Sequence, residues 1–135
     1  MGTLIGIGNT INTSAASGRV NLYADAVFAG NNWTNNGDGS YSHPVSFATV
    51  DTLYIITDSS AFIEGNLYEV IFDITARTGG AITPVVSNFI GTSQNTVGID
   101  FTTEITAGAV PNNTGFRTNG LVTGLTLDNL RCFAL

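Results

Sequence analysis

Two segments in which apolar and polar side chains alternate constrain the fold most strongly. In residues 67–76 the apolar positions are Tyr68, Val70, Phe72 and Ile74, and the polar side chains between them include Glu69 and Asp73. In residues 97–105 the positions of one face are Ile99, Phe101, Thr103 and Ile105. Side chains two residues apart lie on the same face of a β-strand. Both segments are therefore predicted to be strands with one face in a core and the other facing outward.

Further short strands are predicted at fairly even spacing between turns rich in Gly, Asn and Thr. They cover residues 41–47, 53–57, 81–86, 115–118, 121–127 and 129–133. Pro44 and Pro84 lie within two of them, and because proline donates no ladder hydrogen bond we expect both at sheet edges or bulges. No segment has a convincing amphipathic helical pattern. Eight or nine short strands predict an all-β fold, an antiparallel β-sandwich with jelly-roll topology.

The length of the chain indicates a single domain. A chain of 135 residues is long enough to bury a core without disulfides or metals. We expect residues 1–18 to form an N-terminal strand or arm with a polar linker, and residues 19–135 to form the sandwich. Cys132 is the single cysteine and lies in an apolar run, so we interpret it as a small buried side chain rather than a reactive thiol.

Charge excludes two classes of partner. The chain has no lysine, four arginines and a formal net charge of −6. Binding to nucleic acid or to anionic membranes needs clustered Lys and Arg, so neither is expected. Charged residues are only 10% of the chain, below the roughly 25% of typical domains. The resulting neutral surface of hydroxyls and amides suits packing against other subunits, or contact with sugars.

The first residues do not resemble a targeting signal. Residues 1–11 are mildly apolar but lack a basic region, and no segment approaches the length of a membrane-spanning helix. We therefore expect synthesis in the cytoplasm without a signal peptide.

No catalytic constellation is predicted. His43 is the single histidine, which excludes a metal site made of several histidines and leaves no convincing catalytic triad. Four carboxylates on the expected outward faces could form the acid pair of a glycoside hydrolase, namely Glu69, Asp73, Asp100 and Glu104. Solvated sheet faces carry such residues routinely. We therefore predict that the protein is not an enzyme.

Three aromatic side chains are candidates for a sugar-binding platform. Trp33, Tyr41 and Tyr54 could stack on the apolar face of a sugar ring. The competing interpretation, which we favour, places Trp33 in the core or at the rim of the sandwich.

The order of several motifs resembles a known family. The motifs are NNWTNNGDGSYSH (31–43), EGNLYEVIFDIT (64–75), GGAITPVV (79–86), GIDFTTEITAG (98–108) and GLTLDNLRCF (124–133). Together they resemble the carbohydrate-binding-module-like jelly-roll domains of bacteriophage virion proteins. The resemblance covers roughly residues 31–133, and it implies a non-enzymatic sandwich of eight to nine strands. Its members serve as glycan-binding modules, tail-fibre or tail-tip domains, and capsid decoration proteins.

The resemblance also implies a site for a structural calcium ion. Many carbohydrate-binding jelly rolls hold Ca²⁺ between the first and last strands, and Asp128 occupies the matching acidic position. However, residues 1–24 contain no Asp or Glu to complete the site, and Ca²⁺ takes six to eight oxygen ligands. We therefore expect no metal, with Asp128 as a weak candidate ligand.

The resulting functional expectation is a capsid decoration or cement protein on the outer surface of a bacteriophage virion. Its partners would be the major capsid protein or other virion proteins, and a homo-oligomer is expected. The apolar candidates for these contacts are Leu4, Ile5, Ile7, Phe133 and Leu135. The alternative is a lectin-like module of a tail fibre or other attachment structure, which binds polysaccharide through Trp33, Tyr41 and Tyr54.

Overall fold

The chain forms two layers of antiparallel strands. A computed structural model describes residues 18–47, 50–119 and 122–135, and it contains no helix within these ranges. The strands are β1 (Phe28–Ala29), β2 (Thr34–Asn35), β3 (Tyr41–Phe47), β4 (Thr52–Ile55), β5 (Leu67–Arg77), β6 (Ile82–Val86), β7 (Phe89–Ile90), β8 (Gly98–Thr106), β9 (Gly115–Thr118) and β10 (Val122–Ala134).

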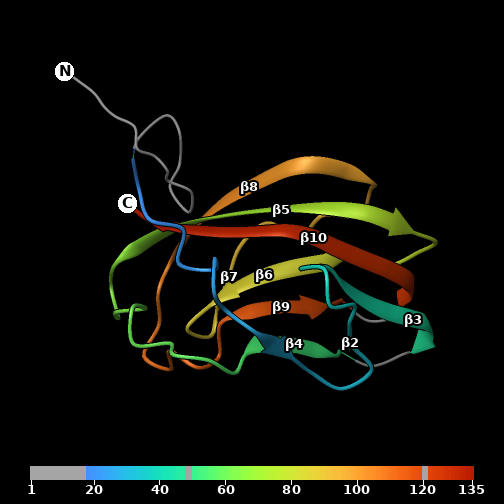
Figure 1. Ribbon diagram of the computed structural model, residues 1–135, viewed down its shortest axis with the longest axis horizontal. Helices are drawn as coiled ribbons and strands as arrows, with labels where there is room; N and C mark the ends of the chain where they lie inside the picture. Colours follow the sequence, from blue (N-terminus) through green and yellow to red (C-terminus); the bar gives the residue numbers. More distant parts are fainter. Residues whose placement is uncertain (1–17, 48–49, 120–121) are drawn as a thin grey trace.

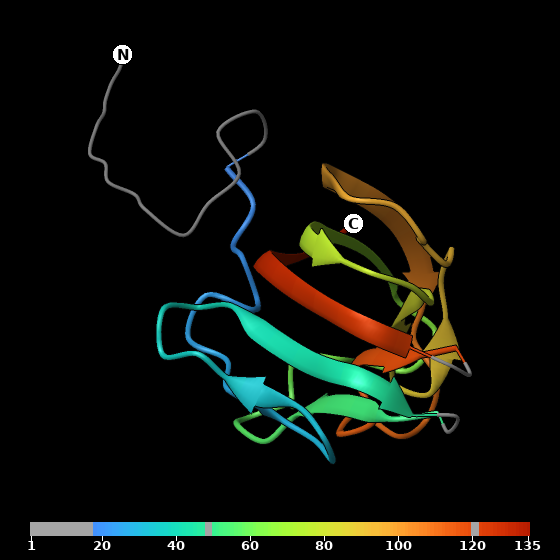
Figure 2. The same ribbon diagram turned by 90° about the vertical axis from the view of Figure 1, so that its right-hand side faces the viewer.

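The order of the strands is that of a jelly roll. The first sheet has the order β1-β4-β9-β6-β7 and the second has the order β2-β3-β10-β5-β8. From β3 onward the chain changes sheets at nearly every strand, and only β6 and β7 follow each other in one sheet. Figures 1 and 2 show the two sheets facing each other, with β8, β5 and β10 in one layer and β6, β9 and β4 in the other. The predicted β-sandwich is confirmed.

The core lies between the sheets and is rich in aromatic side chains. The predicted inward face of β5 is buried, since Tyr68, Val70, Phe72 and Ile74 are at most 1% exposed. From the opposite sheet, Phe116 packs edge-on against Phe72 with ring centroids 5.2 Å apart. Burial of each such side chain contributes roughly 1.5–3 kcal/mol. The alternation in the sequence therefore marks the residues that hold the sheets together.

Two predictions on the pairing of β5 and β8 were wrong. Ile99, expected in the core, is 73% exposed, and Asp73, expected to face solvent, is 4% exposed. The register shifts between Phe72 and Ile74, and Asp100 has a positive φ of 57°. This β-bulge places an extra residue in β8 and turns Ile99 outward. Asp73 is buried because Asn129 and Asp100 bond to its carboxylate.

The boundaries of three other segments also differ from the predictions. The segments 121–127 and 129–133 belong to a single strand, β10, whose register shifts between Asp128 and Arg131. β7 lies between the predicted segments 81–86 and 97–105, where no strand was predicted. These differences arise where a strand is very short or contains a bulge, because the alternation of apolar and polar residues is then interrupted.

The two prolines lie in different settings. β2 pairs only with Tyr41 and Ser42, so at Pro44 no described strand lies on that side of β3, as expected. Pro84 is not at an edge, because β6 lies between β9 and β7. The Pro84 carbonyl accepts a hydrogen bond from the Gly91 N–H, at 2.9 Å, just past the end of β7. The missing donor of Pro84 is tolerated because ladder pairing stops there.

Candidate functional site

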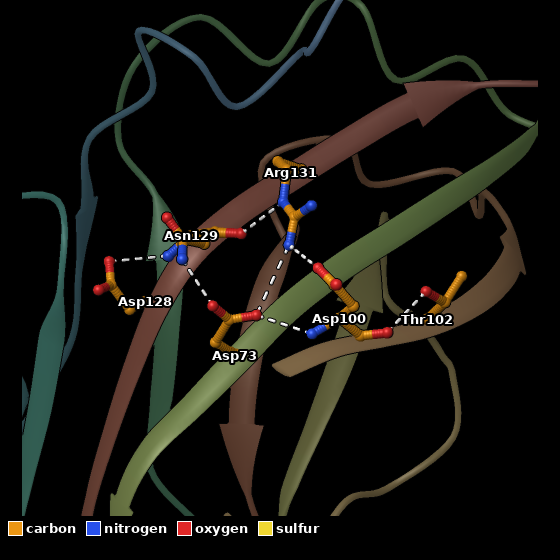
Figure 3. A network of polar contacts seen from close by, with 6 residues as sticks. All are labelled: Asp73, Asp100, Thr102, Asp128, Asn129 and Arg131. Atoms are coloured by element: carbon orange, nitrogen blue, oxygen red, sulfur yellow. Dashed lines mark hydrogen bonds and ion pairs between the residues drawn. The ribbon is translucent and has the colours of Figure 1, made fainter. Parts of the chain in front are cut away.

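A polar cluster joins three strands at the bulge of β10. The Asp73 carboxylate on β5 accepts hydrogen bonds from the Asp100 N–H at 2.8 Å and from the Asn129 side-chain amide at 2.6 Å. Arg131 Nη2 lies 2.9 Å from Asp100 Oδ1 and 3.6 Å from Asp73 Oδ1. Figure 3 shows these side chains converging from β5, β8 and β10. The cluster therefore stabilises both bulges from outside the core.

The local backbone explains why the cluster forms. Asp100 and Asn129 both have positive φ, 57° and 50°, a conformation that Asn and Asp adopt more readily than other residues with a side chain. The Asp128 carboxylate accepts a hydrogen bond from the Asn129 N–H at 2.8 Å, and Arg131 Nε donates to the Asn129 carbonyl at 2.9 Å. Polar side chains thus bond to the backbone of both bulges: Asp73 to the Asp100 N–H, and Asp128 and Arg131 to the backbone of Asn129.

The four carboxylates considered for hydrolysis are divided between two places on β5 and β8. Asp73 and Asp100 are engaged in the polar cluster, whereas Glu69 and Glu104 occupy paired positions farther along β5 and β8. Glu69 also forms an ion pair with Arg19 at 2.7 Å. None of the four lines the groove described next. This arrangement supports a structural role for them.

A groove of about 370 Å³ lies beside the polar cluster. Its polar lining comes from residues 21–26, from the Asp38–Gly39 turn and from β10, including Asp128, Asn129 and Arg131. Asp38 accepts hydrogen bonds from the Ser40 hydroxyl at 2.6 Å and the Ser40 N–H at 3.0 Å, and these bonds lower the pKa of its carboxyl. The groove therefore presents a carboxylate, an amide and a guanidinium side by side.

Asp128 has too few companions for a metal site. The part of the chain that the structure describes contains no group of three or more His, Cys, Asp or Glu side chains suited to a metal ion. Asp128 itself bonds to the Asn129 N–H. The weak calcium expectation therefore finds no supporting ligand set among the described residues.

The three candidate aromatics do not share one face. Tyr41 is 5% exposed in the core, and its hydroxyl accepts a hydrogen bond from the Phe28 N–H at 3.1 Å. Tyr54 lies between Leu53 and Ile55, which point into the core, so its side chain faces outward from the other sheet. Trp33 is half-buried against the core, edge-on to His43 with ring centroids 5.1 Å apart. A single stacking platform of these three residues is therefore absent.

His43 belongs to a buried polar network. Its Nε2 lies 2.7 Å from Asp51 Oδ2 and its Nδ1 lies 3.0 Å from the Pro44 carbonyl. The two ring nitrogens therefore connect the His43 side chain to the backbone of its own strand and to the residue before β4. Asn32 donates a further hydrogen bond to Asp51 Oδ2 at 3.1 Å. The His43 side chain is 0% exposed, which indicates a structural role for the pair.

The network closes one side of the sandwich, which we call the closed edge. Here the chain passes directly from β1 in the first sheet to β2 in the second. The Asp51 backbone also joins β9, through its N–H to the Thr118 hydroxyl at 2.8 Å. Sequence reasoning missed Asp51, because no local pattern shows that it meets His43.

The opposite side, which we call the open edge, exposes apolar side chains. Sheet one ends there in β7 and sheet two in β8. Phe89 and Ile90 of β7 are 56% and 53% exposed. In the sequence, the feature that could have indicated β7 is this pair of apolar residues between polar neighbours. Such exposed residues on an edge strand are typical of an interaction surface.

The predicted assembly contacts have different settings. Leu4, Ile5 and Ile7 lie outside the described residues. Phe133 is 3% exposed and lies beneath the Arg19 guanidinium, 4.7 Å from its ring centroid, so it offers no contact surface and that expectation is corrected. Leu135 is 53% exposed and remains available.

The remaining observations concern membranes and related proteins. Within the described residues no helix is long and apolar enough to span a bilayer. A scan against protein-family models found no matching family, and a search of curated proteins found no matching relative.

Proposed function

We propose that this chain is a capsid decoration or cement protein, a non-enzymatic component on the outer surface of a bacteriophage virion. The observation that carries the proposal is the open edge, where Phe89 and Ile90 are exposed on the terminal strand of a sheet. Its support in the sequence is the resemblance to jelly-roll domains of virion proteins and the low content of charged residues, 10%.

Such an attachment involves no chemical reaction and depends on the burial of surface between the protein and the capsid. Full burial of an exposed Phe or Ile side chain contributes about 1.5–3 kcal/mol, which is too little to hold one copy firmly after the costs of association. Many copies on a symmetric shell sum such contacts through multivalency. The net charge of −6 favours a partner surface that is neutral or positive at the contact.

The test is the copy number of this chain in purified virus particles, measured by quantitative mass spectrometry against the major capsid protein. A decoration protein is expected at a copy number comparable with that of the major capsid protein. A handful of copies would indicate a tail or fibre part instead. Complete absence from the particles would refute a role in the virion.

A second candidate function, a glycan-binding module of an attachment structure, is favoured by the groove beside β10. Its volume of about 370 Å³ falls within the range of about 300–1,000 Å³ that is usual for ligand pockets. The hydrogen-bonding groups of Asp38, Asn129 and Arg131 suit a polyhydroxylated ligand.

A glycan array followed by calorimetry tests this candidate. The variant Asp38→Ala should abolish binding. The matched control is Asp58→Ala, because Asp58 accepts the Ser60 N–H at 2.9 Å in a similar turn but does not line this groove. Equal binding by both variants would contradict a ligand site in the groove.

A further inference from the structure

The outer edge of β8 carries unpaired backbone hydrogen-bonding groups. Within the described ranges β8 pairs with β5 alone. The register is regular from Phe101 to Thr106, opposite Phe72 to Leu67. In an antiparallel pair alternate residues direct their N–H and C=O groups away from the neighbouring strand. This stretch therefore presents groups to which another strand can bind.

This edge is protected only in part against added strands, by a bulge at its beginning and by the exposed carboxylates of Asp100 and Glu104. Natural edge strands carry lysine or proline, are short, or are interrupted by bulges. β8 is nine residues long and contains neither lysine nor proline. Its bulge at Asp100 disrupts only the beginning of the strand. Residues 101–106 are thus suited to receive an extended segment.

Charge argues against a second β8 as the occupant. The Asp100 side chain is 65% exposed and Glu104 is also exposed. Pairing two copies of β8 would bring these carboxylates together from both molecules, each with a net charge of −6. Like charges close together on paired strands are destabilising. The occupant should therefore carry no negatively charged side chain.

Residues 3–7 have the required chemistry. Residues 1–17 contain no charged side chain. In an extended strand, Ile5 and Ile7 share one face while Leu4 and Gly6 share the other. The β-branched isoleucines also favour pairing in a sheet. This is the strand-like segment that the sequence places before the sandwich.

The described chain begins over β10 and β5, one strand away from β8. Arg19 Nη2 lies 2.7 Å from Glu69 Oε1, and Glu69 is paired with Glu104 across β5 and β8. Residues 8–18 connect Arg19 to the segment and, if extended, cover about 35 Å. Neighbouring strands are only about 5 Å apart. The segment is therefore long enough to reach an adjacent molecule.

We propose that residues 3–7 of one copy add as a strand to the outer edge of β8 in a neighbouring copy. Backbone hydrogen bonds supply the pairing, as in other cases of strand addition. The contact is head-to-tail, so it can continue from copy to copy. It adds a partner, a second copy of this chain, to the function proposed above and does not rest on it.

Cysteine cross-linking in the purified full-length chain tests the proposal. Gly6→Cys protein carrying a size tag is mixed with untagged Thr102→Cys protein and oxidised mildly. A second mixture uses Glu104→Cys, whose side chain shares the exposed face with Thr102 and covers the alternative register. The expected result is a disulfide-linked heterodimer on a non-reducing gel in at least one mixture.

The matched control is Thr75→Cys, an exposed position on β5 away from the edge. We expect at least tenfold less heterodimer with this variant. Native Cys132 is buried, and burial raises the pKa of its thiol to about 12, so it should not cross-link. Equal cross-linking at Thr75, or cross-linking only within a single Gly6→Cys/Thr102→Cys chain, would overturn pairing between copies.

Light scattering provides a second, independent measurement. The full-length chain is expected to form dimers and larger species as its concentration rises. A variant lacking residues 2–12 should remain monomeric with an unchanged thermal midpoint. A full-length chain that stays monomeric at all concentrations would refute the proposal, and the copy number in virus particles would remain a separate test of the proposed function.

Discussion

The closed and open edges of the sandwich differ in how the terminal strands of the two sheets are covered. At the closed edge, β1 and β2 link the two sheets, and His43, Asp51 and Asn32 form a buried hydrogen-bonded network. At the open edge, β7 exposes Phe89 and Ile90, and no described strand covers β8. The difference indicates that polar groups of the chain itself stabilise one side, while the other side is available to partners.

The largest effect is expected at a glycine of the closed edge. A Cβ at Gly30 would lie 1.7 Å from the Thr52 carbonyl oxygen. Gly30→Ala should therefore force the backbone of β4 away and lower the free energy of unfolding by at least about 3 kcal/mol. Urea denaturation of the variant and of the unchanged protein measures this loss.

The control for Gly30→Ala is Gly37→Ala. Gly37 has a φ of 82°, but a Cβ there meets no atom within 4 Å. Gly37→Ala should lower the free energy of unfolding by about 1–2 kcal/mol, because a residue with a Cβ disfavours this positive φ. Equal losses in the two variants would show that close approach of the strands does not stabilise this edge.

A somewhat smaller effect is expected from the buried network. Asp51→Ala leaves the His43 ring, which is 0% exposed, and the Asn32 amide without their carboxylate. Removing the partner of a buried hydrogen-bonding group costs about 1–3 kcal/mol. Because two groups lose the same carboxylate and the Asp51 side chain is only 8% exposed, the loss should lie near the upper figure. Glu69→Ala removes the more exposed pair with Arg19 and should cost at most about 1 kcal/mol. Thermal unfolding of both variants tests this ranking.

Alkaline pH should destabilise the core between the edges. Burial raises the pKa of the Cys132 thiol to about 12 and raises the pKa of Tyr23 well above its usual value. Both groups stay protonated in the folded state. The unfolded chain releases these protons from about pH 8.5 upward, so stability is complete below that pH and falls as the pH approaches the folded-state values.

The expected loss from Cys132 alone is about 2 kcal/mol at pH 10. Thermal midpoints measured between pH 7 and pH 10 should show this decline, and the variant Cys132→Ala should flatten it. A midpoint that falls equally in the variant would assign the alkaline sensitivity to other groups. Tyr23→Phe should change the pH dependence of the thermal midpoint only above about pH 10.

The smallest change in stability is expected at the open edge. Phe89→Ser and Ile90→Ser remove side chains that are more than half exposed, so the free energy of unfolding should change by no more than about 0.5 kcal/mol. Binding to capsids that lack this chain, measured by co-sedimentation, should nevertheless be lost. The matched control is Val27→Ser, at a 39% exposed residue beside β1. If Val27→Ser weakened capsid binding as much as Phe89→Ser and Ile90→Ser do, the open edge would not be the specific contact surface.

The sequence predicted the regular parts of the fold well. The bounds of β3 and β9 match the predicted segments 41–47 and 115–118, because period-two alternation and turn residues act locally. The bulge at Asp100 was missed because a positive φ at a non-glycine residue leaves no mark in the pattern. The two-residue strand β7 is too short to show alternation.

The polar contacts were much less accessible from the sequence. Asp51 meets His43, and Asp73 meets Asn129, only because strands distant in the chain lie side by side. Burial of Phe133 was missed for a similar reason, since Arg19 covers it from more than a hundred positions earlier in the chain. Predicting such contacts requires the register between strands, which single-strand patterns do not contain.

The position of β10 has a consequence for synthesis of the protein. β10 is the last strand of the chain, yet it lies at the centre of the second sheet, between β3 and β5. During synthesis β3 and β5 emerge before β10, so this sheet cannot be completed until residues 122–134 have left the ribosome. Until β10 is in place, β3 and β5 lack the strand that lies between them, and their backbone groups on that side are without their partners in the sheet.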